Sequence, residues 1–343
     1  MKRKNIFKSL FAAAMALIMI FGAAPLSGFV GIRLPMLSLK AEAAITGTTE
    51  DGLFEYEVEK KWTGSEYEYG VRITRCDKNV SGKVVVPETI EGYEVKWIGG
   101  VYSYTWAFQG CTGITSIVIP DSVISIGDSA FSGCTSLAEI TIPDSVTEIG
   151  EFAFSGCTSL LKVVLSKNMT AIEARTFSGC SSLESIIIPE GVTKIGTRSK
   201  SEDFMCDGAA FYGCTSLKEI IIPDSVTEIW WRAFSGCTSL SKVKLPKNLT
   251  SINSDVFSGC TSLAEITIPD SVTSIGSSAF EGCTSLAEID IPDSVTSIGS
   301  SAFEGCTSLA EIDIPDSVTS IGGSAFSGCT SLSKVDLPKD LTM

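Results

Sequence analysis

Apolar and polar residues repeat along most of the chain with one fixed period. A 23-residue copy runs from Cys283 to Gly305 and reads CTSLAEIDIPDSVTSIGSSAFEG, and Cys306 begins the next copy. An internal period of this length is typical of a solenoid, in which each copy forms one coil. The phase is marked by Cys111, Cys134, Cys157, Cys180, Cys214, Cys237, Cys260, Cys283, Cys306 and Cys329. Successive cysteines are equally spaced except from Cys180 to Cys214, where the longer interval places an 11-residue insertion near 197–207.

The first half of each copy predicts a short strand followed by a turn. Leu286, Ile289 and Ile291 are separated by more polar residues, so their side chains point toward one core. Pro292 ends the strand because proline cannot donate to a sheet ladder. Asp293 then begins a turn, since its short side chain bonds nearby backbone amides.

The second half of each copy returns apolar side chains to the same core. Val295 and Ile298 point inward, and residues 301–303 predict a single helical or 3₁₀ turn that buries Phe303. One copy buries apolar groups worth at most about 10–20 kcal/mol, whereas ordering its backbone and side chains costs about 35 kcal/mol. A single copy is therefore unfolded, and stacked copies are stable because they share a continuous core.

The two ends of the chain differ from the repeats. Residues 54–58 and 67–73 alternate as strands do, and residues 83–86 lead into the first copy. We therefore expect residues 44–86 to form an N-terminal β cap. The sequence stops at Met343 partway through a copy, and we expect a fragment of a longer product rather than a last repeat that frays.

The repeat pattern L-x-x-I-x-I-P-x-x-V-T-x-I-G-x-x-A-F-x-G-C resembles the BspA-like leucine-rich repeats, also called the Treponema pallidum type. Residues 87–343 fit this pattern, and residues 86–95 resemble the wider first repeat of such arrays. The resemblance implies a leucine-rich-repeat solenoid of mainly parallel β structure with short helical or 3₁₀ turns. It also implies a surface or secreted bacterial protein that acts in adhesion and partner binding.

The N-terminal residues have the pattern of a secretory signal peptide. A basic stretch precedes apolar residues 10–24, and Ala41-Glu42-Ala43 is a small-x-small cleavage site. We expect removal of residues 1–43, export of the remainder, and no membrane insertion after cleavage. The alternative is an uncleaved membrane anchor, although the apolar run is shorter than the roughly 20 residues that a span needs.

Charge and composition exclude several functions. Residues 44–343 carry a formal net charge of −19, which repels nucleic acid and anionic membranes. The chain contains no histidine, the commonest general base and metal ligand. We therefore expect no enzyme activity and no cofactor. A polysaccharide hydrolase based on carboxylates is the remaining enzymatic alternative, but its catalytic pair should break the repeat.

The cysteines predict a ladder of free thiols. Stacking in register places equivalent residues about 4.8 Å apart with parallel side chains, whereas a disulfide needs converging Cβ atoms about 3.8 Å apart. Cys76 and Cys206 lie outside the ladder; either could pair with another group, although we expect the two to lie far apart.

The exposed position between the two strand isoleucines is the first candidate binding surface. In order along the array it holds Val118, Thr141, Val164, Ile187, Ile221, Lys244, Thr267, Asp290, Asp313 and Asp336. We predict partner binding through all of these except the two threonines, because exposed apolar patches usually mark contacts. The alternative is that valine and isoleucine simply suit strands. The acidic rows should repel one another, and calcium or a basic partner segment would relieve that repulsion.

Aromatic residues near one phase of the repeat are the second candidate surface. They are Tyr102, Tyr104 and Trp106 in the first copy, Phe204 in the insertion, and Trp230 and Trp231 in the following copy. Such side chains stack on sugars or anchor a protein contact. The alternative is that one of the paired tryptophans packs beneath the insertion.

These observations predict a secreted or cell-surface module that binds an extracellular protein or glycan. The alternative is a targeting or scaffold region of a longer secreted protein whose effector part is absent.

Overall fold

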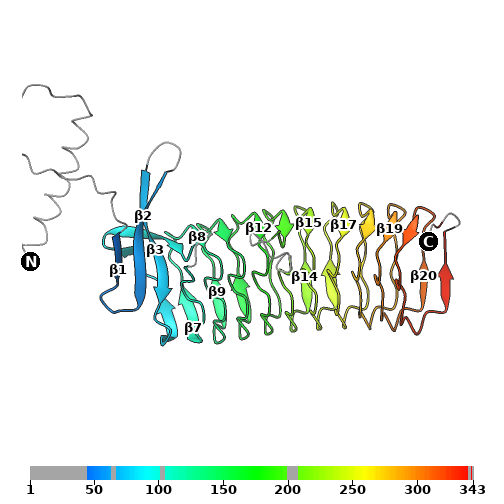
Figure 1. Cartoon of the computed structure of the whole chain (residues 1–343), viewed down its shortest axis with the longest axis horizontal. Coiled ribbons are helices and arrows are strands. Elements are labelled where there is room, and N and C mark those ends of the chain that lie inside the picture. Colours follow the sequence, from blue (N-terminus) through cyan, green and yellow to red (C-terminus); the bar gives the residue numbers. More distant parts are fainter. Residues whose placement is uncertain (1–44, 63–66, 101–104, 199–207, 339–340, 342–343) are drawn as a thin grey trace, which may run out of the picture. The chain divides into compact units, whose positions relative to one another are not determined.

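A computed structural model describes residues 45–62, 67–100, 105–198, 208–338 and 341. The predicted signal peptide lies outside these residues. Residues 44–343 form one unit, in which the coils predicted from the repeat stack one upon the next (Figure 1). The described residues contain strands and turns but no helix. The expected leucine-rich-repeat solenoid of mainly parallel β structure is confirmed.

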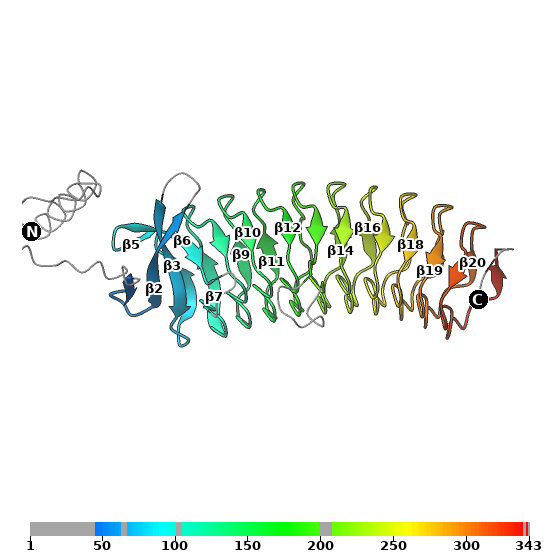
Figure 2. The ribbon, with the colours of Figure 1, turned by 45° about the horizontal axis from the view of Figure 1, so that its top comes forward.

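An antiparallel sheet covers the N-terminal end of this stack. Strand β1 (Ile45–Thr48) pairs with β2 (Phe54–Trp62), and β2 pairs with β3 (Tyr67–Cys76). Strand β3 then pairs in parallel with β6 (Tyr93–Ile98), which also forms a hairpin with β5 (Thr89–Ile90). Because β3 belongs to both arrangements, the cap continues directly into the first coils (Figure 2).

The L-x-x-I-x-I segments stack as parallel strands and form what we call the long-strand face. Its strands are β4 (Ser81–Val85), β7 (Gly113–Val118), β9 (Glu139–Thr141), β11 (Lys162–Val164), β14 (Glu219–Ile221), β16 (Lys242–Lys244), β20 (Glu311–Asp313) and β22 (Lys334–Asp336). The ladder is interrupted twice. One coil keeps only the bridge between Ser185 and Glu219, and residues 265–267 and 288–290 lie in no strand.

A second parallel ladder follows the proline turn and forms the short-strand face. Its two-residue strands are β8 (Ser125–Ile126), β10 (Glu148–Ile149), β12 (Ala171–Ile172), β13 (Lys194–Ile195), β15 (Glu228–Ile229), β17 (Ser251–Ile252), β18 (Ser274–Ile275), β19 (Ser297–Ile298) and β21 (Ser320–Ile321). Strand β13 pairs with both β12 and β15. The inserted residues between β13 and β15 therefore leave the stacking intact.

The Ala-Phe segments form the turn edge of each coil. The Phe303 ring is fully buried and stacks on Phe280 at 5.4 Å between ring centroids and on Phe326 at 5.5 Å. The expected turn is present, with the amide of Glu304 donating to the carbonyl of Ser301 at 3.0 Å. Ser301 has a φ of 56°, a left-handed conformation that prevents the turn from continuing as a helix.

Thiols line the core as the sequence predicts. Each repeat thiol from Cys134 onward donates to the carbonyl of a phenylalanine in the preceding coil, as Cys306 does to Phe280 at 3.2 Å. Burial raises the pKa of the Cys260 and Cys306 thiols to about 12. Cys76 was expected outside the ladder, but it begins it: its hydrogen bond with the Cys111 thiol, together with burial, raises the pKa of Cys76. Cys206 lies outside the described residues.

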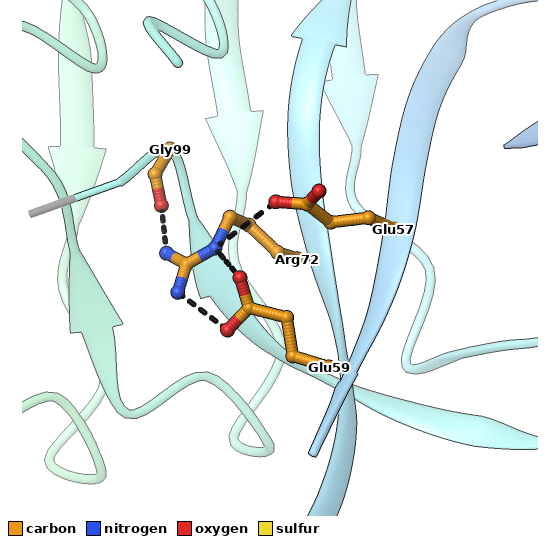
Figure 3. Close-up of polar contacts among 4 residues, drawn as sticks. All are labelled: Glu57, Glu59, Arg72 and Gly99. Atoms are coloured by element: carbon orange, nitrogen blue, oxygen red, sulfur yellow. Dashed lines mark hydrogen bonds and ion pairs between the residues drawn. The ribbon is translucent and has the colours of Figure 1, made fainter. Parts of the chain in front are cut away.

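One arginine fastens the cap to the first coil. Arg72 on β3 donates from Nε and Nη2 to the carboxylate of Glu59 on β2, at 2.5 Å and 2.7 Å (Figure 3). Its Nη1 donates to the carbonyl of Gly99, which directly follows β6. Glu57 lies 3.6 Å from Nε, and burial raises the pKa of this carboxyl. Arg72 thus holds two acidic side chains of the cap against the backbone of the array.

Candidate binding surface

All eight predicted residues of the long-strand face are exposed: Val118, Val164, Ile187, Ile221, Lys244, Asp290, Asp313 and Asp336. Most of them alternate with buried isoleucine, valine or leucine side chains, because successive side chains of an extended segment point to opposite sides. The exposed apolar members are the most unusual, since 85% of Ile187 and 51% of Ile221 are accessible to solvent.

These apolar residues belong to one row across neighbouring coils. Val85 pairs with Val118 in the β4–β7 ladder, and Thr141 pairs with Val164 in the β9–β11 ladder. We call Val85, Val118, Val164, Ile187 and Ile221 the apolar strip. With the coil of Thr141 included, the strip covers six coils, or about 24 Å at the spacing of neighbouring strands.

Sequence reasoning missed Val85 as part of this strip. The segment Val84-Val85-Val86-Pro87 repeats the pattern of two apolar residues around one exposed position before proline. That pattern could have identified β4 as the first strand of the long-strand face, although residues 81–86 were expected to belong to the cap. Leu161 directly precedes β11 and is also exposed, but no sequence pattern around it predicts its exposure.

The C-terminal part of the long-strand face is acidic. We call Glu265, Glu288, Asp290, Glu311 and Asp313 the acidic segment. All five side chains are exposed, and no ion pair links any of them to another described residue. Acids nearer the N-terminus do have partners, such as Glu184 with Lys218 and Glu219 with Lys242.

A hollow of about 290 Å³ lies where the acidic segment begins. It is lined by Ser241, Lys242, Val243, Glu265, Ile266, Thr267, Glu288, Ile289 and Asp290. It coincides with the second interruption of the long-strand ladder, between β16 and β20. Residues 265–267 and 288–290 in this part of the face lie in no strand.

No group of three potential metal ligands occurs among the described residues, and nothing in this part of the chain supports the predicted calcium alternative. Likewise, no described helix is long and apolar enough to span a membrane.

Among the predicted aromatic residues that the structure describes, Trp230 and Trp231 are neighbours with ring centroids 6.5 Å apart, whereas Trp106 lies away from them. Trp106 and Trp231 are exposed, but five coils separate them, or about 24 Å. Trp230 is partly buried and donates to Glu228 at 3.1 Å, and its ring is tilted by 49° from that of Trp231. Tyr102, Tyr104 and Phe204 lie outside the described residues.

Stacked 23-residue coils with one buried leucine, isoleucine and phenylalanine core define this chain as a leucine-rich-repeat solenoid. The BspA type leucine rich repeat region matches residues 104–202 and 251–343 in six copies. The chain belongs to this family of repeat proteins, and the resemblance noted from its sequence is confirmed.

Solved structures of bacterial repeat proteins are similar to the chain. A leucine-rich cell surface protein of Faecalibacterium prausnitzii is 28% identical, with 86% of this chain and 95% of that one covered and a TM-score of 0.47. A leucine-rich repeat protein of Bacteroides ovatus is 30% identical, covering 83% and 94%, with a TM-score of 0.44. The leucine-rich repeat protein of T. pallidum is 29% identical, covering 72% and 89%, with a TM-score of 0.46. No curated protein matches the chain.

Proposed function

We propose that this protein is an extracellular binding module that recognises a protein partner through the apolar strip of the long-strand face. The observation that carries the proposal is the exposure of branched apolar side chains in one row, with Ile187 and Ile221 the most accessible. Burying such side chains in an interface releases about 25 cal/mol for each Å² of apolar surface removed from water.

Strand propensity does not account for every member of this row. Ile187 lies in a coil whose long-strand segment forms only one isolated bridge, at Ser185. A residue that served only to favour strand structure would be expected inside a strand. Neither core packing nor strand formation therefore explains why the most exposed residue of the row is an isoleucine.

The remaining parts of the proposal rest on the sequence and on the family. The signal-peptide pattern of residues 1–43 supports export, and membership of the BspA-type family supports a secreted or surface location. Acidic residues recur with the repeat period, whereas a catalytic pair should break that period, which favours binding over carbohydrate hydrolysis. A scaffold region of a longer secreted protein would use the same face.

The test replaces Val164, Ile187 and Ile221 with lysine in residues 44–343. These side chains leave the core, so the variant should fold as the parent does, as measured by circular dichroism and thermal unfolding. Binding to a panel of extracellular-matrix proteins, cell-surface proteins and glycans should weaken at least tenfold for the protein that the parent binds.

A matched variant carries the same added charge on another face. Thr147, Thr193 and Thr227 are exposed residues that flank the short-strand face, and their replacement by lysine should leave binding unchanged. Equal loss of binding in both variants, or no loss in either, would contradict the proposal. Binding of a glycan that depends on Trp231 would instead place the site on the turn edge.

A further inference from the structure

The exposed side chains of the long-strand face change along the array from apolar to basic and then to acidic. Its N-terminal coils present the apolar strip, from Val85 to Ile221. Lys242 and Lys244 follow on β16, and the last four coils then carry six carboxylates against one lysine: Glu265, Glu288, Asp290, Glu311, Asp313, Lys334 and Asp336. A partner that covers the whole face must therefore match an apolar region and an acidic region in that order.

The charges of the acidic segment are balanced only in part, by Lys334, which lies opposite Glu311 in the β20–β22 ladder. Lys334 forms an ion pair with Asp336 at 2.7 Å, and Lys242 forms one with Glu219 at 3.6 Å. The five carboxylates between these two lysines have no ion-pair partner among the described residues. Adjacent coils lie about 4.8 Å apart, so the carboxylates repel one another, and a bound cation relieves that repulsion.

The hollow at this position has the chemistry to receive a basic side chain. Glu265, Glu288 and Asp290 line it, together with Lys242, which is paired with Glu219. Carboxylates bind the charged end of lysine or arginine. The two coils between β16 and β20 have no strand at residues 265–267 and 288–290.

We propose that the partner of the long-strand face is a polypeptide segment with an apolar part followed by a basic part, which lie on the apolar strip and the acidic segment respectively. This inference rests on the proposed function and adds the chemistry of the partner. The apolar strip is about 24 Å long and the acidic end about 15 Å, given the spacing of the coils. An extended chain advances about 3.3 Å per residue, so roughly seven apolar residues and four to five basic ones match the face.

The test uses four labelled 14-residue peptides and residues 44–343 of the protein. The first has seven alternating valines and threonines, a Gly-Ser spacer and five lysines. The second replaces the lysines with glutamates, the third replaces the valines with serines, and the fourth is a scrambled form of the first. Fluorescence anisotropy should give saturable binding of the first peptide, at least tenfold tighter than that of each other peptide, and increasing salt should weaken it.

Two protein variants locate the charge effect. The first neutralises the acidic segment by E265Q, E288Q, D290N, E311Q and D313N, and it should bind the first peptide at least tenfold more weakly. The second changes net charge equally by D121N, E190Q, D270N, D293N and D316N, which are exposed residues of the proline turns with no ion pair to a described residue. It should bind within twofold of the parent. Circular dichroism should show that both are folded.

The outcomes separate this inference from the proposed function. If the first peptide does not bind, or if both charge variants bind it equally, the partner is not basic and the inference is wrong. In that case a panel protein whose binding still depends on Val164, Ile187 and Ile221 leaves the proposed function standing. Concentration-dependent dimers in sedimentation velocity that are abolished by V164K, I187K and I221K would show that a second copy occupies the face, which also overturns the inference.

Discussion

Replacing Phe303 with alanine tests how the array is held together. The Phe303 side chain is fully buried, with rings stacked against both of its faces at 5.4 Å and 5.5 Å. Loss of a buried phenylalanine costs about 3–5 kcal/mol, of which each lost ring contact contributes about 0.5–1.5 kcal/mol. We expect the upper part of the range because the rings on both sides are left facing a cavity.

The loss should remain near the C-terminal end. Each coil contacts mainly its neighbours, so stability is close to a sum of local terms. Hydrogen exchange measured by mass spectrometry on F303A should show fast exchange from about residue 280 onward, while residues near 120–190 keep their protection. A cooperative domain would lose protection everywhere at once.

A second variant calibrates the magnitude. Phe326 is only partly buried and stacks on Phe303, so F326A should cost about half as much as F303A. Uniform loss of protection along the chain in F303A would refute the local-coupling argument. No change at all would mean that Phe303 is not a core residue.

Three further tests by substitution concern other parts of the structure. Alanine at Gly299 would place Cβ 2.4 Å from the Ser277 nitrogen, whereas alanine at Gly323 would meet nothing within 4 Å. Thermal unfolding should therefore show that G299A is clearly destabilised and that G323A is as stable as the parent. Equal effects of the two substitutions would contradict the close packing of adjacent coils. Burial raises the pKa of the Cys260 and Cys306 thiols to about 12, from 9.0 for a free thiol. As the pH rises from 9 toward 12, the unfolded chain therefore loses these protons before the folded protein does. The free energy of unfolding should fall over this range by about 1.4 kcal/mol per pH unit for each thiol. Melting curves of the C260A/C306A variant should therefore show a shallower alkaline decline, and an unchanged slope would count against buried thiols. Arg72→Met removes the hydrogen bonds of Arg72 to Glu59 and Gly99 and should destabilise β2 and β3 by about 2 kcal/mol. Faster hydrogen exchange in those strands should show the loss, while unchanged exchange would show that the cap does not depend on this contact.

Much of this protein could be predicted from the sequence alone, because one period decides most of it. Equivalent residues of a 23-residue repeat must occupy equivalent places, so the inward position of Phe303 and the ladder of thiols follow from the pattern. The exposed row on the long-strand face follows as well, since side chains alternate along a strand. Even the interruption near residue 197 is visible in the sequence, as the one longer interval between successive repeat cysteines, from Cys180 to Cys214.

Other features depend on contacts between coils, which a repeat pattern does not specify. The two-residue strands of the short-strand face, such as β19, exist only because a neighbouring coil supplies the hydrogen-bond partner. The left-handed conformation of Ser301 is likewise held by its amide, which donates to Gly323 of the next coil at 3.0 Å.

The candidate surfaces also depend partly on the sequence and partly on the packing of the coils. The aromatic residues can be picked out from the sequence, but only the stacking shows that Trp106 lies five coils from Trp231. The Arg72 contact with Gly99 joins residues of the cap and the array that no local pattern relates. The ladder is interrupted between β16 and β20, in the coils of residues 265–267 and 288–290, and the repeat pattern does not show this break. A periodic sequence determines which side chains point inward, whereas distances between coils and the satisfaction of backbone groups are decided only when the coils pack.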